Sequence, residues 1–85
     1  MKYFLVRADL LTKVDIEDMI VIVDHDKELK KDKQYEARFY SILEPTKFYK
    51  SITSGRFVSV QVEVGHYIEL DEGDKRIKIL KRIYG

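Results

Sequence analysis

The sequence predicts one small, mainly β domain in which five antiparallel strands form a barrel or a sandwich. Apolar and polar residues alternate strictly along parts of the chain, most clearly in FVSVQVEV, residues 57–64. The apolar runs are rich in β-branched and aromatic residues, which favour strands. Gly, Ser and Asp separate these runs and indicate turns. The 85 residues, 1–85, suffice for a single domain with a thin core.

Composition narrows the class of protein. Hydrophobic residues make up 45% and charged residues 36% of the chain, which is typical of a globular domain. Cysteine is absent, so neither a disulfide framework nor a thiolate zinc site is expected, and a reducing compartment fits. The longest apolar run, Met19–Val23, is far too short to span a membrane, and charges interrupt the N-terminal apolar stretch. We therefore expect a cytoplasmic protein without membrane association.

The net charge of +1 limits the ways in which the chain can bind nucleic acid. Phosphate neutralisation by Lys and Arg supplies most of the affinity of a non-specific nucleic-acid binder, so such proteins usually carry a large basic excess. This chain lacks that excess overall. Any nucleic-acid interface must therefore rest on a local patch.

Residues 2–10, KYFLVRADL, predict the first strand. One face carries apolar side chains throughout, and the other is apolar at its start, which indicates a central or doubly covered strand. The first face comprises Phe4, Val6, Ala8 and Leu10, and the second comprises Tyr3, Leu5 and Arg7.

The next segments predict a second strand and its connections. Residues 12–18 are ambiguous, with Asp15 able to cap one short helical turn. Residues 18–25 form a strand because the run Ile20–Val23 is β-branched, and its continuous apolarity implies burial on both faces or one face against a partner. Residues 26–33, DKELKKDK, predict a solvated loop.

Residues 34–43, QYEARFYSIL, predict a third strand with two distinct faces, which Glu44-Pro45 ends. Tyr35, Ala37, Phe39, Ser41 and Leu43 lie on one face, and Gln34, Glu36, Arg38, Tyr40 and Ile42 on the other. Residues 46–56 predict a long loop with two aromatic and three basic side chains. Loops of this length in small domains are often functional.

Residues 57–70, FVSVQVEVGHYIEL, predict one long strand bent at Gly65, because the alternation between the two faces of a strand continues through the glycine. Two strands joined at Val64–His66 are the alternative.

A tight turn follows at 71–74, with Gly73 suited to positive φ, and 75–84 returns as the last strand. SH3-like and OB barrels share this general pattern; the bent strand is fourth here, which favours an SH3-like or another arrangement over OB.

The positions of the two histidines in the sequence indicate structural rather than catalytic or metal-binding roles. Parity places His66 on the core-facing side, where a neutral imidazole is expected to hydrogen-bond to a backbone carbonyl. His25 lies in DHD, but on a strand the flanking aspartates point away from it, so the spacing for a metal site is poor. No metal or other cofactor is expected. The chain has no nucleophile elbow and no phosphate-binding glycine loop, so an enzyme is not favoured.

The predicted function is that of a small non-enzymatic binding module for nucleic acid, single-stranded or RNA. Bases stack on exposed rings while cations follow the backbone. Two basic and aromatic clusters stand out, one in and after the long loop and one at the C-terminus, where Lys81, Arg82 and Tyr84 continue the basic run. The predicted interface residues are Lys47, Phe48, Tyr49, Lys50, Arg56 and Phe57 from the first cluster and Lys75, Arg76 and Lys78 from the second. Tyr40 and Tyr67, placed outward by parity, would extend the stacking platform.

Other interpretations remain open at this point. Phe48 and Tyr49 could cover an open barrel end, and the basic C-terminal strand could be an edge that charge protects against aggregation. A protein-interaction or assembly module, with residues 19–23 buried in a homo-oligomer or against another protein, is the main alternative function. A small nuclease that uses Arg38, Arg56 or His66 is a further one.

Overall fold

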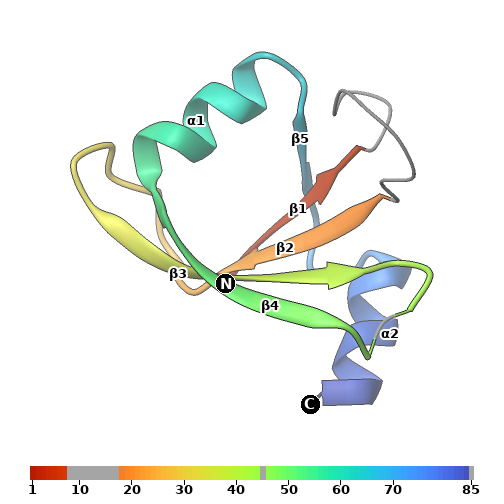
Figure 1. Cartoon of the computed structure of the whole chain (residues 1–85). Helices are drawn as coiled ribbons and strands as arrows, with labels where there is room; N and C mark the ends of the chain where they lie inside the picture. Colours follow the sequence, from red (N-terminus) through yellow and green to blue (C-terminus); the bar gives the residue numbers. More distant parts are fainter. Residues whose placement is uncertain (8–17, 45, 85) are drawn as a thin grey trace.

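The computed structural model of the chain describes residues 1–7, 18–44 and 46–84. It shows a mainly β domain, which confirms the predicted class (Figure 1). Its strands are β1 (Lys2–Val6), β2 (Met19–Val23), β3 (Gln34–Ser41), β4 (Phe48–Ser54) and β5 (Tyr67–Leu70), and its helices are α1 (Gly55–Glu63) and α2 (Lys75–Tyr84). The strands form one antiparallel sheet in the order β4-β3-β2-β1-β5.

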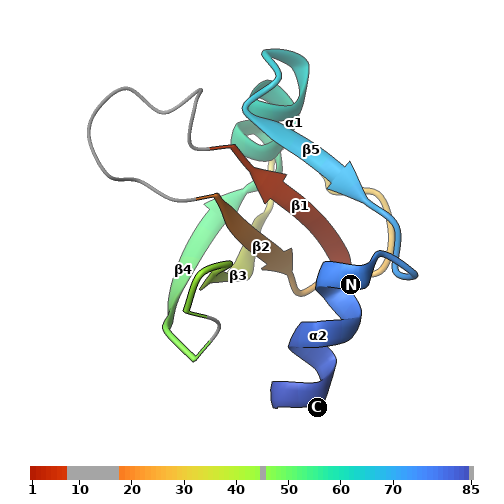
Figure 2. The ribbon, with the colours of Figure 1, turned by 90° about the vertical axis from the view of Figure 1, so that its right-hand side faces the viewer.

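The sheet is open, so the predicted barrel is not confirmed. β4 and β5 form its two edges and do not pair with each other. α1 begins directly after β4, crosses one face and contacts both edge strands. α2 lies on the opposite face (Figures 1 and 2). We call these two surfaces of the sheet the α1 face and the α2 face.

Both faces of β1 and β2 are largely buried, one beneath each helix. Val58 of α1 packs on one cluster of the α1 face, which includes Phe4 and Val21. Ile77 and Leu80 of α2 pack on a second cluster, formed by Tyr3, Ile20 and Tyr40. The predicted double coverage of the first strand is therefore confirmed. The alternative in which Met19–Val23 faces a partner is wrong, because β2 is a central strand with both faces covered.

The first three predicted strands and the loop at 26–33 are found where the sequence places them. β1, β2 and β3 pair in register from Lys2↔Val23 through Val23↔Ala37. Leu29 is the half-buried residue of the otherwise exposed loop and packs against the core of the α1 face. Ala8, Leu10, Pro45 and all but the last residue of the ambiguous segment 12–18 lie outside the described residues.

The predicted long loop at 46–56 is wrong, because most of it is strand β4. β4 pairs antiparallel with β3 from Tyr40↔Phe48 to Gln34↔Ser54. Its side chains are mostly exposed because it is an edge strand that the helices contact only in part. An edge strand lacks the buried apolar face on which strand patterns depend, so its sequence is difficult to distinguish from a loop.

The predicted bent strand at 57–70 is wrong in its first half, and so is the alternative of two joined strands. Ser54 caps α1, with its Oγ accepting a hydrogen bond from the backbone N–H of Phe57 at 3.0 Å. Gly65 ends the helix with φ +81°, and the N–H groups of Gly65 and His66 donate to the carbonyls of Val62 and Gln61. This is a Schellman motif, in which glycine takes the left-handed position without strain.

The C-terminal segment is a helix, so the predicted last strand at 75–84, and with it the protected edge, is wrong. Ile77, Leu80 and Tyr84 recur at helical spacing and turn toward the sheet, while Ile79 is exposed. The turn at 71–74 is confirmed by a hydrogen bond from the N–H of Asp74 to the carbonyl of Asp71 at 2.9 Å. The expected positive φ at Gly73 is wrong, since Gly65 alone has one among the described glycines.

Asp74 caps α2 and makes the stability of the helix dependent on pH. Its carboxylate accepts hydrogen bonds from the backbone N–H and the guanidinium of Arg76 at 2.9–3.0 Å. The side-chain hydrogen bond from Arg76, aided by the one from its backbone, lowers the pKa of Asp74 from 3.8 to about 2. A lowered folded-state pKa contributes stability above the unfolded-state value of about 4, and this contribution is lost as the pH falls toward 2.

Replacing Asp74 with Asn should therefore flatten the acid limb of the stability profile. Asparagine still caps a helix but carries no charge to lose. We expect the thermal midpoint of Asp74→Asn, followed by circular dichroism between pH 5 and pH 2, to fall less than that of the parent. Asp32→Asn, in the exposed loop at 26–33, is the control and should follow the parent curve. Parallel curves for Asp74→Asn and the parent would contradict the assigned role.

Candidate nucleic-acid interface

β4 separates its three predicted interface residues between the two faces of the sheet. Phe48 and Lys50 lie on the α2 face, since they pair with Tyr40 and Arg38. Tyr49 lies on the α1 face, where its ring stacks on Phe39 with centroids 4.9 Å apart and planes 4° apart. Lys47 precedes the strand and forms an exposed ion pair with Glu44 at 2.7 Å. A ligand on one face therefore meets only part of the predicted cluster.

Three aromatic rings meet on the α2 face where β4 approaches the end of α2. The ring centroid of Tyr40 lies 5.2 Å from that of Phe48 and 4.8 Å from that of Tyr84, and Phe48 lies edge-on to Tyr84 at 5.3 Å. Tyr40 is buried beneath the other two, which stay 45% and 40% exposed, respectively. Partial desolvation, with a smaller contribution from Tyr40, raises the pKa of Tyr84. The cluster presents neutral, supported rings to solvent.

A pair of cations lies beside these rings. Arg38 and Lys50 face each other directly across β3 and β4, in the register position next to Tyr40 and Phe48 on the same face. Both are exposed, and neither forms an ion pair with a carboxylate among the described residues. Like charges directly opposite one another destabilise a sheet, so this pair favours an anion that binds between them. Arg38, Phe48, Lys50 and Tyr84 form what we call the basic–aromatic surface.

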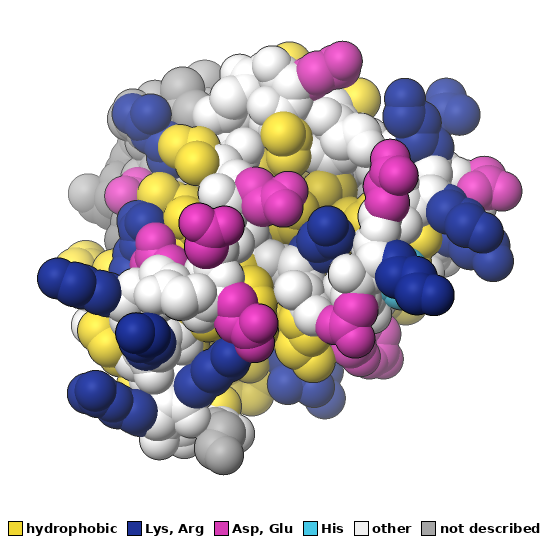
Figure 3. Space-filling model, turned by 180° about the vertical axis from the view of Figure 1, so that it is seen from behind, with side chains coloured by type: hydrophobic (Ala, Val, Ile, Leu, Met, Phe, Trp, Pro, Cys, Tyr) yellow, Lys and Arg dark blue, Asp and Glu magenta, His cyan; other side chains and the backbone are white. Residues whose placement is uncertain are grey.

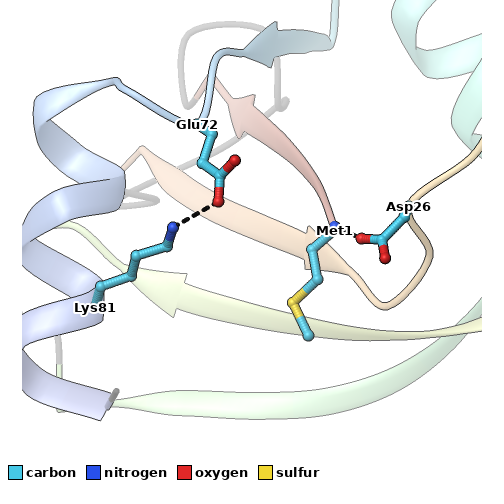
Figure 4. Close-up of polar contacts among 4 residues, drawn as sticks. All are labelled: Met1, Asp26, Glu72 and Lys81. Atoms are coloured by element: carbon cyan, nitrogen blue, oxygen red, sulfur yellow. Dashed lines mark hydrogen bonds and ion pairs between the residues drawn. The ribbon is translucent and has the colours of Figure 1, made fainter.

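A hollow of about 160 Å³ extends from this surface into the gap between the sheet and α2. Aromatic rings and two cations line much of it: Tyr3, Arg38, Tyr40, Lys81 and Tyr84. Lys81 donates to Glu72 at 2.8 Å, and its Nζ lies 5.8 Å from the ring centroid of Tyr3. The amine of Met1, another lining residue, pairs with Asp26 (Figure 4). Lys81 and the Met1 amine at the border of the hollow are thus ion-paired, whereas Arg38 has no ion pair among the described residues.

The predicted residues of the two helices lie away from this surface. Phe57, in the first turn of α1, contacts Tyr67 edge-on at 6.1 Å. Arg56 lines a groove of about 380 Å³ together with Glu28, Glu63 and other residues. Lys75 and Lys78 are exposed on α2, away from its buried side, and Arg76 is paired with Asp74. Basic side chains gather over α2, while acidic and basic ones intermingle elsewhere on that side of the molecule (Figure 3).

Several expectations about the aromatic residues are corrected. Tyr40 and Tyr67 are only 3% and 7% exposed, so neither extends an outward platform. Burial, with a smaller contribution from Tyr49, raises the pKa of Tyr67 to about 12. Phe48 and Tyr49 do not cover a barrel end, because they lie on opposite faces of an open edge.

The sequence clusters did not identify Arg38 as the partner of Lys50. Finding it requires the pairing of β3 with β4, which a loop at 46–56 would not form. Tyr84 follows the C-terminal basic run, and only the helical form of that run brings its ring onto Tyr40. The residues of the nuclease hypothesis are separated, since Arg38 lies on the α2 face whereas Arg56 belongs to α1 on the other face.

The histidines make local contacts. Nδ1 of His66, which is half-buried, lies 2.7 Å from Oε1 of Gln61, so its side-chain partner is an amide rather than the expected backbone carbonyl. The ring of His25 lies against Tyr35 at 4.8 Å. Within residues 1–7, 18–44 and 46–84, no group of three or more His, Asp or Glu side chains could hold a metal ion.

No helix in the part of the chain that the structure describes is long and apolar enough to cross a membrane. Comparison with protein-family models, with curated proteins and with solved structures finds no match to this chain. Any statement about function therefore rests on the geometry of its own residues.

Proposed function

We propose that this protein is a non-enzymatic binding module that holds single-stranded nucleic acid on its basic–aromatic surface. The observation that carries the proposal is the cation pair Arg38–Lys50, which has no carboxylate partner among the described residues and lies beside the exposed rings of Phe48 and Tyr84. Successive side chains on one face of a strand are about 7 Å apart. A base stacked on Phe48 would thus leave its phosphate within reach of the two cations.

Two interactions would contribute to the free energy of this binding: base stacking and phosphate neutralisation. Stacking of one base on an aromatic side chain contributes about 1–3 kcal/mol, and each neutralised phosphate adds a salt-dependent term. Two contacted phosphates give a slope of about −1.4 for log K against log salt concentration on a single strand. The affinity should therefore fall about sevenfold between 50 and 200 mM salt. A shallow slope also agrees with the small net charge of +1.

Reversing both cations should abolish most of the electrostatic affinity. We expect the double variant Arg38→Glu/Lys50→Glu to bind a fluorescein-labelled single-stranded oligonucleotide at least about 25-fold more weakly at 0.1 M salt, measured by fluorescence anisotropy. The matched control, Lys30→Glu/Lys31→Glu, reverses two exposed cations in the loop at 26–33, remote from the surface, and should bind nearly as the parent does. Equal losses in the two would indicate non-specific attraction and refute the assigned surface.

Removing the ring of Phe48 tests the stacking contribution separately from charge. Phe48→Ala should weaken binding by about 5- to 150-fold, the loss expected for one stacked base. Tyr49→Ala is the matched control, because Tyr49 is the adjacent, similarly exposed ring on the opposite face of the same strand. Binding of the parent should depend little on base sequence. No binding by the parent at 50 mM salt would end the proposal.

A further inference from the structure

β4 presents an open edge, and the alternation along the strand shows which of its backbone groups point to that edge. Next to the strand, the N–H of Ser41 donates to the carbonyl of Lys47 at 3.2 Å, and the N–H of Gly55 donates to the carbonyl of Lys33 at 3.0 Å. Antiparallel strands alternate between hydrogen-bonded and non-hydrogen-bonded pairs. The odd-numbered residues of β4 therefore bond to β3. The backbone groups of Phe48, Lys50 and Ile52 and the N–H of Ser54 point to the outer edge, where the described sheet has no further strand.

We propose that this edge pairs with β4 of a second copy of the chain, antiparallel, with Ser51 opposite Ser51 at the two-fold axis. The proposal is independent of nucleic-acid binding. It joins the two sheets through backbone hydrogen bonds between Lys50 of one copy and Ile52 of the other, and between Phe48 and Ser54. All seven residues of β4, Phe48–Ser54, take part.

Charge and hydrogen-bond parity select this register among the symmetric ones. A two-fold axis at Lys50 would place two lysines directly opposite one another, which is destabilising. An axis at Ile52 would leave the start of the strand, including Phe48, without a partner strand. With the axis at Ser51, Lys50 lies across from Ile52 of the second copy, and Glu36 of that copy is the next residue along the same face. The lysine ammonium is thereby directed toward a carboxylate.

The exposure of the strand favours a second copy over solvent. Edge strands are usually protected by charges, proline or short length, but β4 has one lysine and no proline along its length. Ile52 is 68% exposed and Tyr49 is 55% exposed. In the dimer the methylene stem of Lys50 covers Ile52, and Tyr49 packs beside Thr53 of the second copy. β5 offers only four residues at the other edge.

The symmetry has a consequence for the α2 face. A two-fold axis at an antiparallel edge pair runs perpendicular to the sheet, so both α2 faces lie on the same side. The two cation pairs, Arg38 with Lys50, then lie on one continuous surface. Because each Lys50 is also directed toward Glu36 of the other copy, this surface alternates cations, carboxylates and aromatic rings.

A single cysteine at the axis tests the register directly, because the chain has no cysteine of its own. Ser51 and its counterpart form a non-hydrogen-bonded pair with Cα atoms about 4.5 Å apart, a separation that a disulfide spans. Ser51→Cys should convert to a disulfide-linked dimer in a glutathione redox buffer, seen by non-reducing gel electrophoresis. Thr53→Cys, whose counterpart lies about 14 Å away along the strand, should remain monomeric. Equal cross-linking of the two variants, or none in either, overturns the register.

Sedimentation equilibrium tests the association without a disulfide cross-link. We expect the parent mass to rise from 10.1 kDa toward twice that value between about 10 µM and 1 mM protein. Ile52→Pro removes an N–H that points outward, so the variant should keep the parent's circular dichroism spectrum yet sediment as a monomer. A parent protein that remains monomeric at 1 mM refutes the dimer, whatever the outcome of the oligonucleotide titrations.

Discussion

Replacing Gly55 with alanine should destabilise the fold by about 3 kcal/mol, because the new methyl group has no room. A Cβ atom at this position would lie 2.1 Å from the carbonyl oxygen and 2.7 Å from the carbonyl carbon of Lys30. Both are backbone atoms, so no side-chain rotation relieves the clash. The loop would have to move, which disturbs the hydrogen bond from Gly55 to Lys33 and the packing of Leu29. Overpacking of this kind typically costs about 1–3 kcal/mol and occasionally more.

Urea denaturation followed by circular dichroism measures the effect, with Gly73→Ala as the matched control. A Cβ on Gly73 meets nothing within 4 Å, and its φ is not positive. This exposed substitution should change the free energy of unfolding by no more than about 0.5 kcal/mol. For a domain of this size the loss at Gly55 should also lower the thermal midpoint by more than about 10 °C. Equal stability of the two variants would show that the loop does not approach the start of α1 so closely.

Truncating Ile77 should cost about 2–5 kcal/mol, whereas truncating Ile79 should cost less than about 1 kcal/mol. Ile77 is fully buried and anchors α2 against Tyr3, Ile20 and Tyr40. Ile79 is 47% exposed on the other side of the helix. Because the exchange is the same at both sites and both lie within α2, differences in helix propensity cancel. The difference between the variants therefore reports burial.

This pair of variants also distinguishes the helix from the strand that alternation suggested for 75–84. A strand would place Ile77 and Ile79 on one face, and both truncations would then cost about the same. A helix places them 200° apart. Chemical denaturation of Ile77→Ala and Ile79→Ala, compared under identical conditions, gives the two free energies of unfolding. Losses within about 0.5 kcal/mol of each other would contradict the docking of α2.

The centre of the sheet was predictable from the sequence because β1 and β2 are covered on both faces and β3 is covered on its α1 face. Long apolar runs such as Met19–Val23 are found only where both faces are buried, so their pattern allows few alternatives. β4 was not predictable in the same way. Its exposed edge position leaves it with mixed residues and no apolar face, and its assignment as a strand depends on pairing with β3.

The candidate site was predictable only in part, for the same reason. Phe48 and Lys50 stand out in the sequence as an aromatic residue and a cation close together. Their neighbours Arg38 and Tyr84 come from distant segments, which the strand register and the docking of α2 bring to the same surface. Composition shows that aromatic and basic residues are present, but it does not show which of them lie on the same face of the sheet.

The segment FVSVQVEVG shows where local and tertiary information separate. Alternating valines favour a strand locally, since β-branched side chains lose freedom in a helix. The helix terminators were nevertheless present in the sequence, with Ser54 before the segment and Gly65 after it. The sequence by itself determined the three central strands, the turn at 71–74 and the absence of a cysteine framework. Only the tertiary structure decided that 55–63 and 75–84 are helices. Residues 67–70 already occupy the edge beside β1. The two apolar faces of the sheet are then covered by the helices that contain the buried residues Val58 and Ile77.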